Sequence, residues 1–77
     1  MRDDEELTTQ QAADLLNVSR PFVTKLLARG EIPFYRVGTH HRLYRSDVEA
    51  YRQTQAARAR QAMREMVEQA EELGLYD

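Results

Sequence analysis

Apolar and polar residues recur with two different periods along this chain, and the changes of period divide it into elements. From Thr9 to Leu16, apolar residues return every three or four positions, as they do on one face of a helix. A second stretch with this spacing runs from Arg20 to about Arg29, only two or three residues further on. Two short helices joined so closely must cross sharply, so the pattern predicts a helix-turn-helix. Val18, between them, is expected to point back into the core.

Both predicted helices have residues that are typical of helix ends. Thr8 and Gln11 form a capping box at the start of the first helix, and Asn17 is expected to end it. Ser19 is the expected N-cap of the second helix. Gly30 suits the left-handed position that follows its last turn.

The period changes to two after the second helix. Tyr35–Val37 and Arg42–Tyr44 alternate polar and apolar residues, with Gly38–His41 between them. This pattern predicts a β-hairpin with a four-residue loop. A hairpin of this size is not stable alone, so we expect it to pack against the helices.

A long helix is predicted to follow the hairpin. Ser46 and Glu49 form a second expected capping box, and no Gly or Pro occurs after them until Gly74. The simplest interpretation is one helix of about 27 residues, from Asp47 to Leu73.

The predicted fold class is therefore mainly α with a small β-hairpin, a winged helix-turn-helix followed by a long C-terminal helix. We expect residues 1–6 to be a disordered acidic tail, with order beginning at Leu7. Residues 7–52 form the predicted winged helix-turn-helix domain, and residues 53–77 a helical extension for dimerisation or partner binding.

The extension has an apolar stripe with the three- and four-residue steps of a coiled-coil seam. The stripe consists of Ala56, Ala59, Met63, Met66, Ala70 and Leu73. Three interpretations remain open at this stage: the helix pairs with a second copy, docks into a groove of another protein, or folds back on its own domain.

The net charge of −2 argues against a nucleic-acid partner, but the charges are segregated. Between Arg20 and Arg45 there are six basic residues and one acidic residue, Glu31, while most acidic residues lie near the chain ends. A basic segment on a helix-turn-helix is typical of a nucleic-acid-binding surface.

The second helix is short and cationic, which suits the major groove of duplex DNA. Arg20 can form two hydrogen bonds to guanine, whereas Lys25 suits a phosphate. The hairpin is the expected wing, along the backbone or minor groove. The predicted DNA contacts are Ser19, Arg20, Pro21, Thr24, Lys25, Arg36, Thr39, His40, His41 and Arg42. The simpler alternative is a solvated basic surface on two packed helices.

Four linked segments resemble the excisionase-like branch of the MerR winged-helix superfamily. They are residues 7–13 (LTTQQAA), 18–21 (VSRP), 30–38 (GEIPFYRVG) and 47–51 (DVEAY). Within that branch, Ser19–Val23 and Val37–His40 are most similar to bacterial antitoxins encoded beside PIN-domain ribonuclease toxins.

The resemblance implies sequence-specific DNA binding, autorepression of an operon and inhibition of a toxin through segments beyond the DNA-binding domain. The chain departs from the family at His41, where members usually have arginine. Members also generally continue beyond this length, so we expect an N-terminal domain of a longer protein. Two alternatives stay open: an excisionase-type factor that bends DNA for a recombinase, and an interaction adaptor that binds an acidic protein without DNA.

No enzymatic, metal-binding or membrane function is expected. The chain has no cysteine, and His40 and His41 lack a third ligand at metal-site spacing. Ser19 and Ser46 suit helix caps and lack a neighbouring base. The N-terminus is acidic, unlike a signal peptide, and no apolar run approaches the roughly 18 residues of a membrane span. We therefore expect no cofactor, and a cytoplasmic location.

Overall fold

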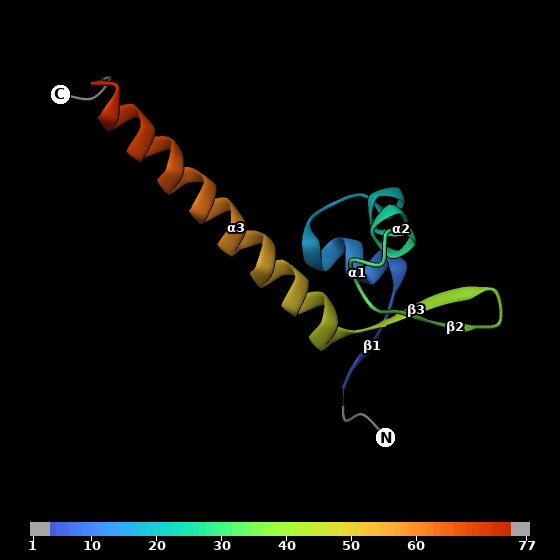
Figure 1. Ribbon diagram of the computed structural model, residues 1–77. Coiled ribbons are helices and arrows are strands. Elements are labelled where there is room, and N and C mark those ends of the chain that lie inside the picture. The colour runs from blue at the N-terminus through green and yellow to red at the C-terminus, as the bar shows by residue number, and fades with distance from the viewer. Residues whose placement is uncertain (1–3, 75–77) are drawn as a thin grey trace.

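A computed structural model of the chain describes residues 4–74, which form three helices and a three-stranded antiparallel sheet (Figure 1). The elements in order are β1 (Glu6–Thr8), α1 (Thr9–Leu16), α2 (Arg20–Ala28), β2 (Tyr35–Val37), β3 (His40–Tyr44) and α3 (Arg45–Glu72). The predicted fold class is confirmed: a small winged helix-turn-helix is followed by a long C-terminal helix.

The core lies where α1, α2, the sheet and the first turns of α3 meet. Its buried apolar residues are Leu7, Ala12, Ala13, Val23, Leu26, Leu27, Ile32, Leu43 and Val48. From the 28 residues of α3, only Val48 is fully buried, with Tyr51 packed beside it. The domain therefore holds α3 by its first two turns.

The predicted helix ends are confirmed for α1 and α2. The Thr8 hydroxyl accepts the Gln11 amide at 3.0 Å, and the Gln11 side chain accepts the Thr8 amide at 2.8 Å. The Ser19 hydroxyl accepts the amide of Phe22 at 3.3 Å. Gly30 follows α2 with a φ of 72°, the left-handed conformation that ends many helices.

The turn between α1 and α2 corrects the prediction for Val18. Asn17 is left-handed, with a φ of 58°, and the Val18 amide donates to the Ala13 carbonyl at 3.0 Å. This hydrogen bond closes a Schellman motif, which reverses the chain. The reversal turns the Val18 side chain outward, so 36% of it is exposed instead of buried in the core.

The sheet differs from the predicted hairpin in two ways. Val37 pairs with His40, so the turn holds only Gly38 and Thr39 and the predicted four-residue loop is wrong. Gly38 has a φ of 62°, as the first central residue of a type II′ turn requires. In addition, β1 pairs with the far side of β3, giving the order β1-β3-β2.

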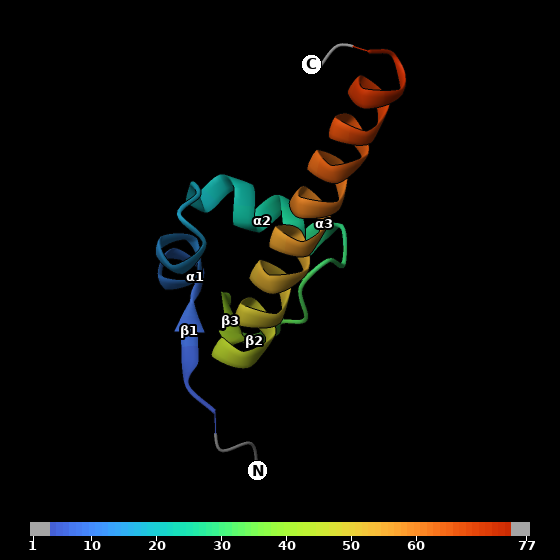
Figure 2. The same ribbon diagram turned by 90° about the vertical axis from the view of Figure 1, so that its left-hand side faces the viewer.

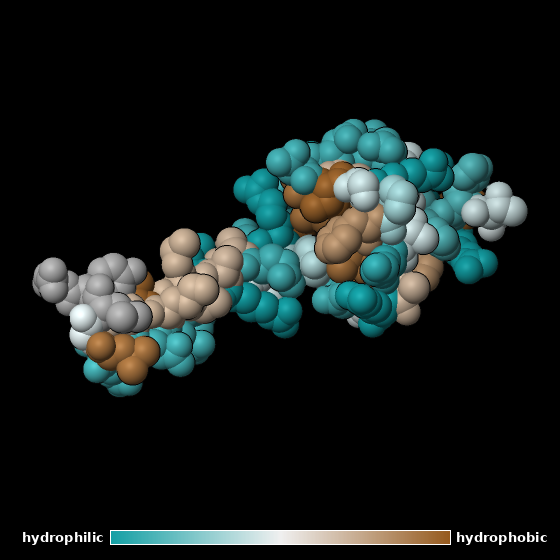
Figure 3. Space-filling view, turned by 90° about the horizontal axis from the view of Figure 1, so that it is seen from above, coloured by the Kyte–Doolittle hydropathy of each residue, from teal (hydrophilic) through white to brown (hydrophobic). Residues whose placement is uncertain are grey.

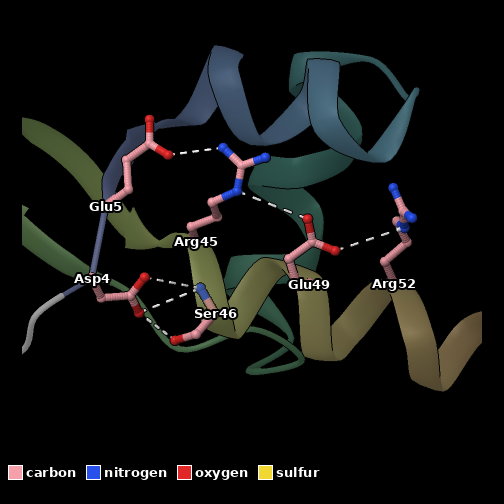
Figure 4. Close-up of polar contacts among 6 residues, drawn as sticks. All are labelled: Asp4, Glu5, Arg45, Ser46, Glu49 and Arg52. Carbon is pink, nitrogen blue, oxygen red and sulfur yellow. Dashed lines mark hydrogen bonds and ion pairs between the residues drawn. The ribbon is translucent and has the colours of Figure 1, made fainter.

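The segment before β1 is attached to the start of α3, which corrects the prediction that order begins at Leu7 (Figure 4). The Glu5 carboxylate pairs with the Arg45 guanidinium at 2.8 Å, and this contact raises the pKa of Arg45. Asp4 accepts the Ser46 amide at 3.3 and 3.4 Å and also binds the Ser46 hydroxyl. Residues 1–3 of the predicted disordered tail lie outside the described residues.

The predicted Ser46–Glu49 capping box is therefore not formed. α3 begins at Arg45, with Tyr44 as an N-cap that makes no side-chain capping bond. The Asp4 carboxylate instead lies at the first turn, where it accepts an amide that has no partner within the helix. A carboxylate that is distant in sequence replaces the local cap.

α3 projects away from the domain, so the interpretation that it folds back is not supported (Figures 1 and 2). The molecule measures 58 × 26 × 19 Å, and the long dimension follows this helix. Among the described helices, none combines the length and hydrophobicity needed to cross a membrane.

Candidate nucleic-acid interface

The start of α2, the hairpin turn and the start of α1 enclose a polar concavity of about 330 Å³. Its lining residues are Thr8, Thr9, Gln10, Arg20, Thr24, Thr39, His40, His41 and Arg42. Six of the ten predicted DNA contacts are in this set, so the fold brings the second helix and the wing together on one surface. We call this surface the helix–wing concavity.

The residues predicted on α2 all lie at its exposed side. Arg20 and Thr24 are one turn apart and line the concavity, and the Thr24 hydroxyl donates to the Arg20 carbonyl at 3.3 Å. Ser19 is occupied as the N-cap, and Pro21 is in the first turn. Lys25 is exposed outside the lining. The base-reading candidates that face the wing are therefore Arg20 and Thr24.

The side chains of the wing differ in how far neighbouring groups restrict their movement. The His41 ring packs edge-on against Phe34, with ring centroids 5.1 Å apart, which limits how that imidazole can turn. Arg42 is half-buried, and its guanidinium donates to the His41 carbonyl at 3.4 Å. Arg36 pairs with His41 across the hairpin but is exposed outside the concavity.

The cations of the domain fall into two groups by their ion pairs. Arg29 pairs with Glu31 at 3.9 Å, and Arg45 pairs with Glu5 and Glu49. In the part of the chain that the structure describes, no ion pair involves the cations Arg20, Lys25, Arg36 and Arg42. The unpaired group is the group predicted to contact DNA, so its charge is available to a phosphate backbone.

A hydrogen bond across the sheet ties the wing to the domain. The Tyr35 hydroxyl of β2 donates to the Glu6 carboxylate of β1, spanning β3 between them. This contact raises the pKa of Tyr35 to about 12. The Tyr35 ring also packs against Tyr44, with centroids 5.2 Å apart. The wing is thus anchored at its base, away from its turn.

Sequence reasoning missed the contribution of the junction between β1 and α1 to the concavity. Thr8, Thr9 and Gln10 line it because Thr8 pairs with Arg42 in the sheet. Only the Thr8–Gln11 capping box was visible in the sequence, and it gives no hint of this long-range pairing. In residues 4–74, no three His, Asp or Glu side chains are grouped so that they could hold a metal ion.

The model of the helix-turn-helix domain family matches residues 6–56 of the chain. An uncharacterised protein of Mycobacterium tuberculosis (strain H37Rv), Rv2310, is 52% identical over 59 residues, which are 77% of this chain and 52% of that protein. A second protein of that strain, "Putative antitoxin VapB50", is 44% identical over 61 residues, which are 79% of this chain and 47% of that protein.

An uncharacterised protein of Mycobacterium bovis, Mb2337, has the same identity and coverage as Rv2310. The chain thus spans about half the length of the curated relatives it matches. No solved structure matches it.

Proposed function

The chain belongs to the helix-turn-helix domain family, and from this premise we propose that it is a sequence-specific DNA-binding repressor of the antitoxin type. The observation that carries the proposal is the helix–wing concavity, whose polar lining includes two arginines that have no ion pair in the described chain. Helix-turn-helix domains bind DNA with the second helix in the major groove.

In this proposal α2 reads bases through its N-terminal residues. Arg20 forms two hydrogen bonds with a guanine edge, and Thr24 contacts the neighbouring base. Ser19 and Pro21 lie at the phosphate backbone beside the helix start. Lys25, outside the concavity, contacts a phosphate and adds affinity without specificity.

The wing contacts the backbone or minor groove beside the site that α2 reads. Thr39 and His40 lie at its tip, with His41 and Arg42 behind them on β3. Arg36 extends the basic surface along β2. Thr8, Thr9 and Gln10 add polar groups at the opposite wall of the concavity. The fold thus offers DNA contacts from three elements.

The antitoxin part of the proposal is supported by the 44% identity with the protein named as an antitoxin. The chain spans about half the length of that relative, so toxin binding is proposed from similarity over the shared half alone. We propose a PIN-domain ribonuclease as the toxin, from the resemblance of Ser19–Val23 and Val37–His40. The protein would repress its own operon in the cytoplasm, as a two-fold dimer on a palindromic operator.

Fluorescence anisotropy tests the DNA-binding proposal directly. The protein is titrated against labelled duplex from its own upstream region and against a scrambled duplex, across a salt series. We expect tighter binding to the upstream duplex and a steep salt dependence, because released counterions contribute about −0.9 to the slope per neutralised phosphate. Lys25→Ala should reduce the slope by about 1 without changing the ratio of the two affinities.

Equal, weak binding to both duplexes would contradict the proposal. Cooperative binding at tandem sites accompanied by DNA bending would instead support the excisionase-type alternative. Binding of an acidic protein in the absence of any duplex binding would support the adaptor alternative.

A further inference from the structure

Thr9, the first residue of α1, is a buried polar residue whose hydroxyl makes no hydrogen bond within residues 4–74. Its exposed fraction is 7%. Two other hydroxyls at the helix–wing concavity are engaged: that of Thr8 accepts the Gln11 amide, and that of Thr24 donates to the Arg20 carbonyl. A polar group in so buried a residue ordinarily has a partner, so the Thr9 hydroxyl indicates a ligand.

The Thr9 hydroxyl is within reach of such a ligand. Among the fully buried side-chain nitrogen and oxygen atoms of the described chain, none lacks a hydrogen-bond partner. The Thr9 oxygen has no partner, so it must keep some contact with solvent although the residue as a whole is buried. Because Thr9 lines the helix–wing concavity, we conclude that its hydroxyl opens onto that surface.

The electrostatics of this wall favour an anion. The N-terminus of a helix carries a partial positive charge, and the first turn of α1 has no acidic residue to neutralise it. None of the residues that line the concavity is acidic, whereas Arg20 and Arg42 are cations without an ion pair in the described chain. In Figure 3 the right-hand end of the molecule, where the wing turn lies, is mainly hydrophilic. Anions are the ligands that such helix ends bind.

The pairing of β1 with β3 places Arg42 beside the start of α1. Arg42 is the partner of Thr8 in the sheet, and Thr9 follows directly. The Arg42 guanidinium is half-buried and donates to the His41 carbonyl at 3.4 Å through one nitrogen. Its other N–H groups remain for a second acceptor. A hydroxyl donor and a guanidinium at the same wall suit the oxygens of one phosphate group.

We infer that Thr9 binds one phosphate group of the DNA backbone, with its hydroxyl as the donor and with Arg42 and the start of α1 supplying positive charge. Thr9 is short and buried, so it cannot reach base edges in a groove, whereas phosphates lie on the outside of the duplex. Such a contact carries no sequence information but fixes the register of the domain on the duplex. Thr9 is thus a positioning residue for the base contact proposed for Arg20.

This inference rests on the proposed DNA binding and adds to it a contact from α1. Substitution of the hydroxyl tests it in the full chain. Thr9→Val keeps the branched shape of the side chain and removes the hydroxyl, whereas Thr9→Ser keeps the hydroxyl. The matched control is Thr54→Val, because the Thr54 hydroxyl lies on α3 outside the concavity and donates to the Ala50 carbonyl at 2.9 Å.

Fluorescence anisotropy is measured with the upstream and the scrambled duplex. We expect Thr9→Val to weaken binding to both by roughly tenfold, the effect of losing one hydrogen bond to a charged group. Thr9→Ser and Thr54→Val should bind like the unmodified chain. The salt slope should stay unchanged in Thr9→Val and fall by about 1 in Arg42→Ala, because only the second substitution removes a charge. Unchanged affinity in Thr9→Val would overturn the inference.

Methylphosphonate linkages then locate the contact on the DNA and separate it from an effect on folding. Each replaces one charged phosphate oxygen by a methyl group, and a series of duplexes carries one such linkage at successive positions. At one position the linkage should weaken binding of the unmodified chain but cause no further loss in Thr9→Val, since the two changes remove the same contact. Losses that add at every position would leave water or a free anion as the ligand of Thr9, and would overturn the inference.

The outcomes distinguish this inference from the proposed function. Equal affinity of the unmodified chain for the two duplexes would contradict sequence-specific recognition, yet a non-additive linkage would still support the phosphate contact. Preference for the upstream duplex, together with additive losses at every linkage, would contradict the phosphate contact alone.

Discussion

The winged domain (residues 4–52) and the projecting segment (residues 53–72) differ in where their apolar residues lie. In the winged domain, nine apolar side chains are buried together and define the fold. In the projecting segment no apolar residue is fully buried, although helical periodicity is equally clear there. Periodicity therefore predicts a helix in both regions, whereas burial shows that only the winged domain has a hydrophobic core of its own.

The charged residues of the two regions are also arranged differently. In the winged domain the acidic residues Glu5, Glu31 and Glu49 pair with some cations and leave the cations of the helix–wing concavity without an ion pair. In the projecting segment cations and anions are separated along the helix axis. We interpret the first pattern as a surface for a polyanion.

The largest expected effect comes from one matched pair of leucines. Leu43→Ala removes a fully buried side chain and should lower the free energy of unfolding by about 2–5 kcal/mol, a large part of the stability of so small a domain. Leu73→Ala, at a 73% exposed position, should leave the unfolding midpoint of the monomer nearly unchanged. Urea denaturation at low protein concentration measures both. If the two substitutions lowered the free energy of unfolding equally, the projecting segment would contribute to the core as much as the winged domain does.

A smaller effect tests how the projecting helix is attached to the domain. Asp4→Ala removes the carboxylate at the first turn of α3 and should lower the free energy of unfolding by about 1 kcal/mol, as loss of an N-cap does. Ser46→Ala should have a smaller effect, because the Ser46 amide still donates to Asp4. If Ser46→Ala were the more destabilising variant in thermal unfolding, the local capping box would be the correct interpretation.

The smallest effect is the pH dependence of the wing anchor. The pKa of Tyr35 is raised to about 12, above the ordinary value of 10, so the folded state favours the neutral phenol that donates to Glu6. The stability from this contact is therefore fully present below pH 10 and is lost as the pH rises toward 12. Absorbance at alkaline pH should show one tyrosine fewer titrating near pH 12 in Tyr35→Phe. An unchanged titration above pH 11 would contradict the anchor.

The sequence predicted the helices well because their signals are local. The Thr8–Gln11 capping box, Ser19 and Gly30 act within a few residues of the ends they define, and all three have the predicted roles. The exposed stripe of α3 was also visible from spacing alone. The ten candidate DNA contacts were chosen in the same way, and the fold gathers six of them.

What the sequence did not reveal depends on contacts between distant segments. The pairing of β1 with β3 brings Asp4 to Ser46 and Thr8 to Arg42, and no local pattern signals it. This pairing explains why order begins before Leu7 and why α3 lacks its expected cap. The two-residue turn at Gly38 was missed because polar residues on the hairpin extend the apparent loop.

We propose that the helix–wing concavity, and not the basic part of α3, recognises DNA. The most direct test compares Arg20→Ala with Arg60→Ala, since both remove one exposed arginine that has no ion pair in the described chain. The measurement is the ratio of affinities for the upstream and scrambled duplexes. Arg20→Ala should reduce this ratio by the roughly 1–3 kcal/mol of a lost guanine contact, and Arg60→Ala should leave it unchanged. An unchanged ratio in Arg20→Ala, or an equal loss in both variants, would show that the concavity does not read the DNA sequence.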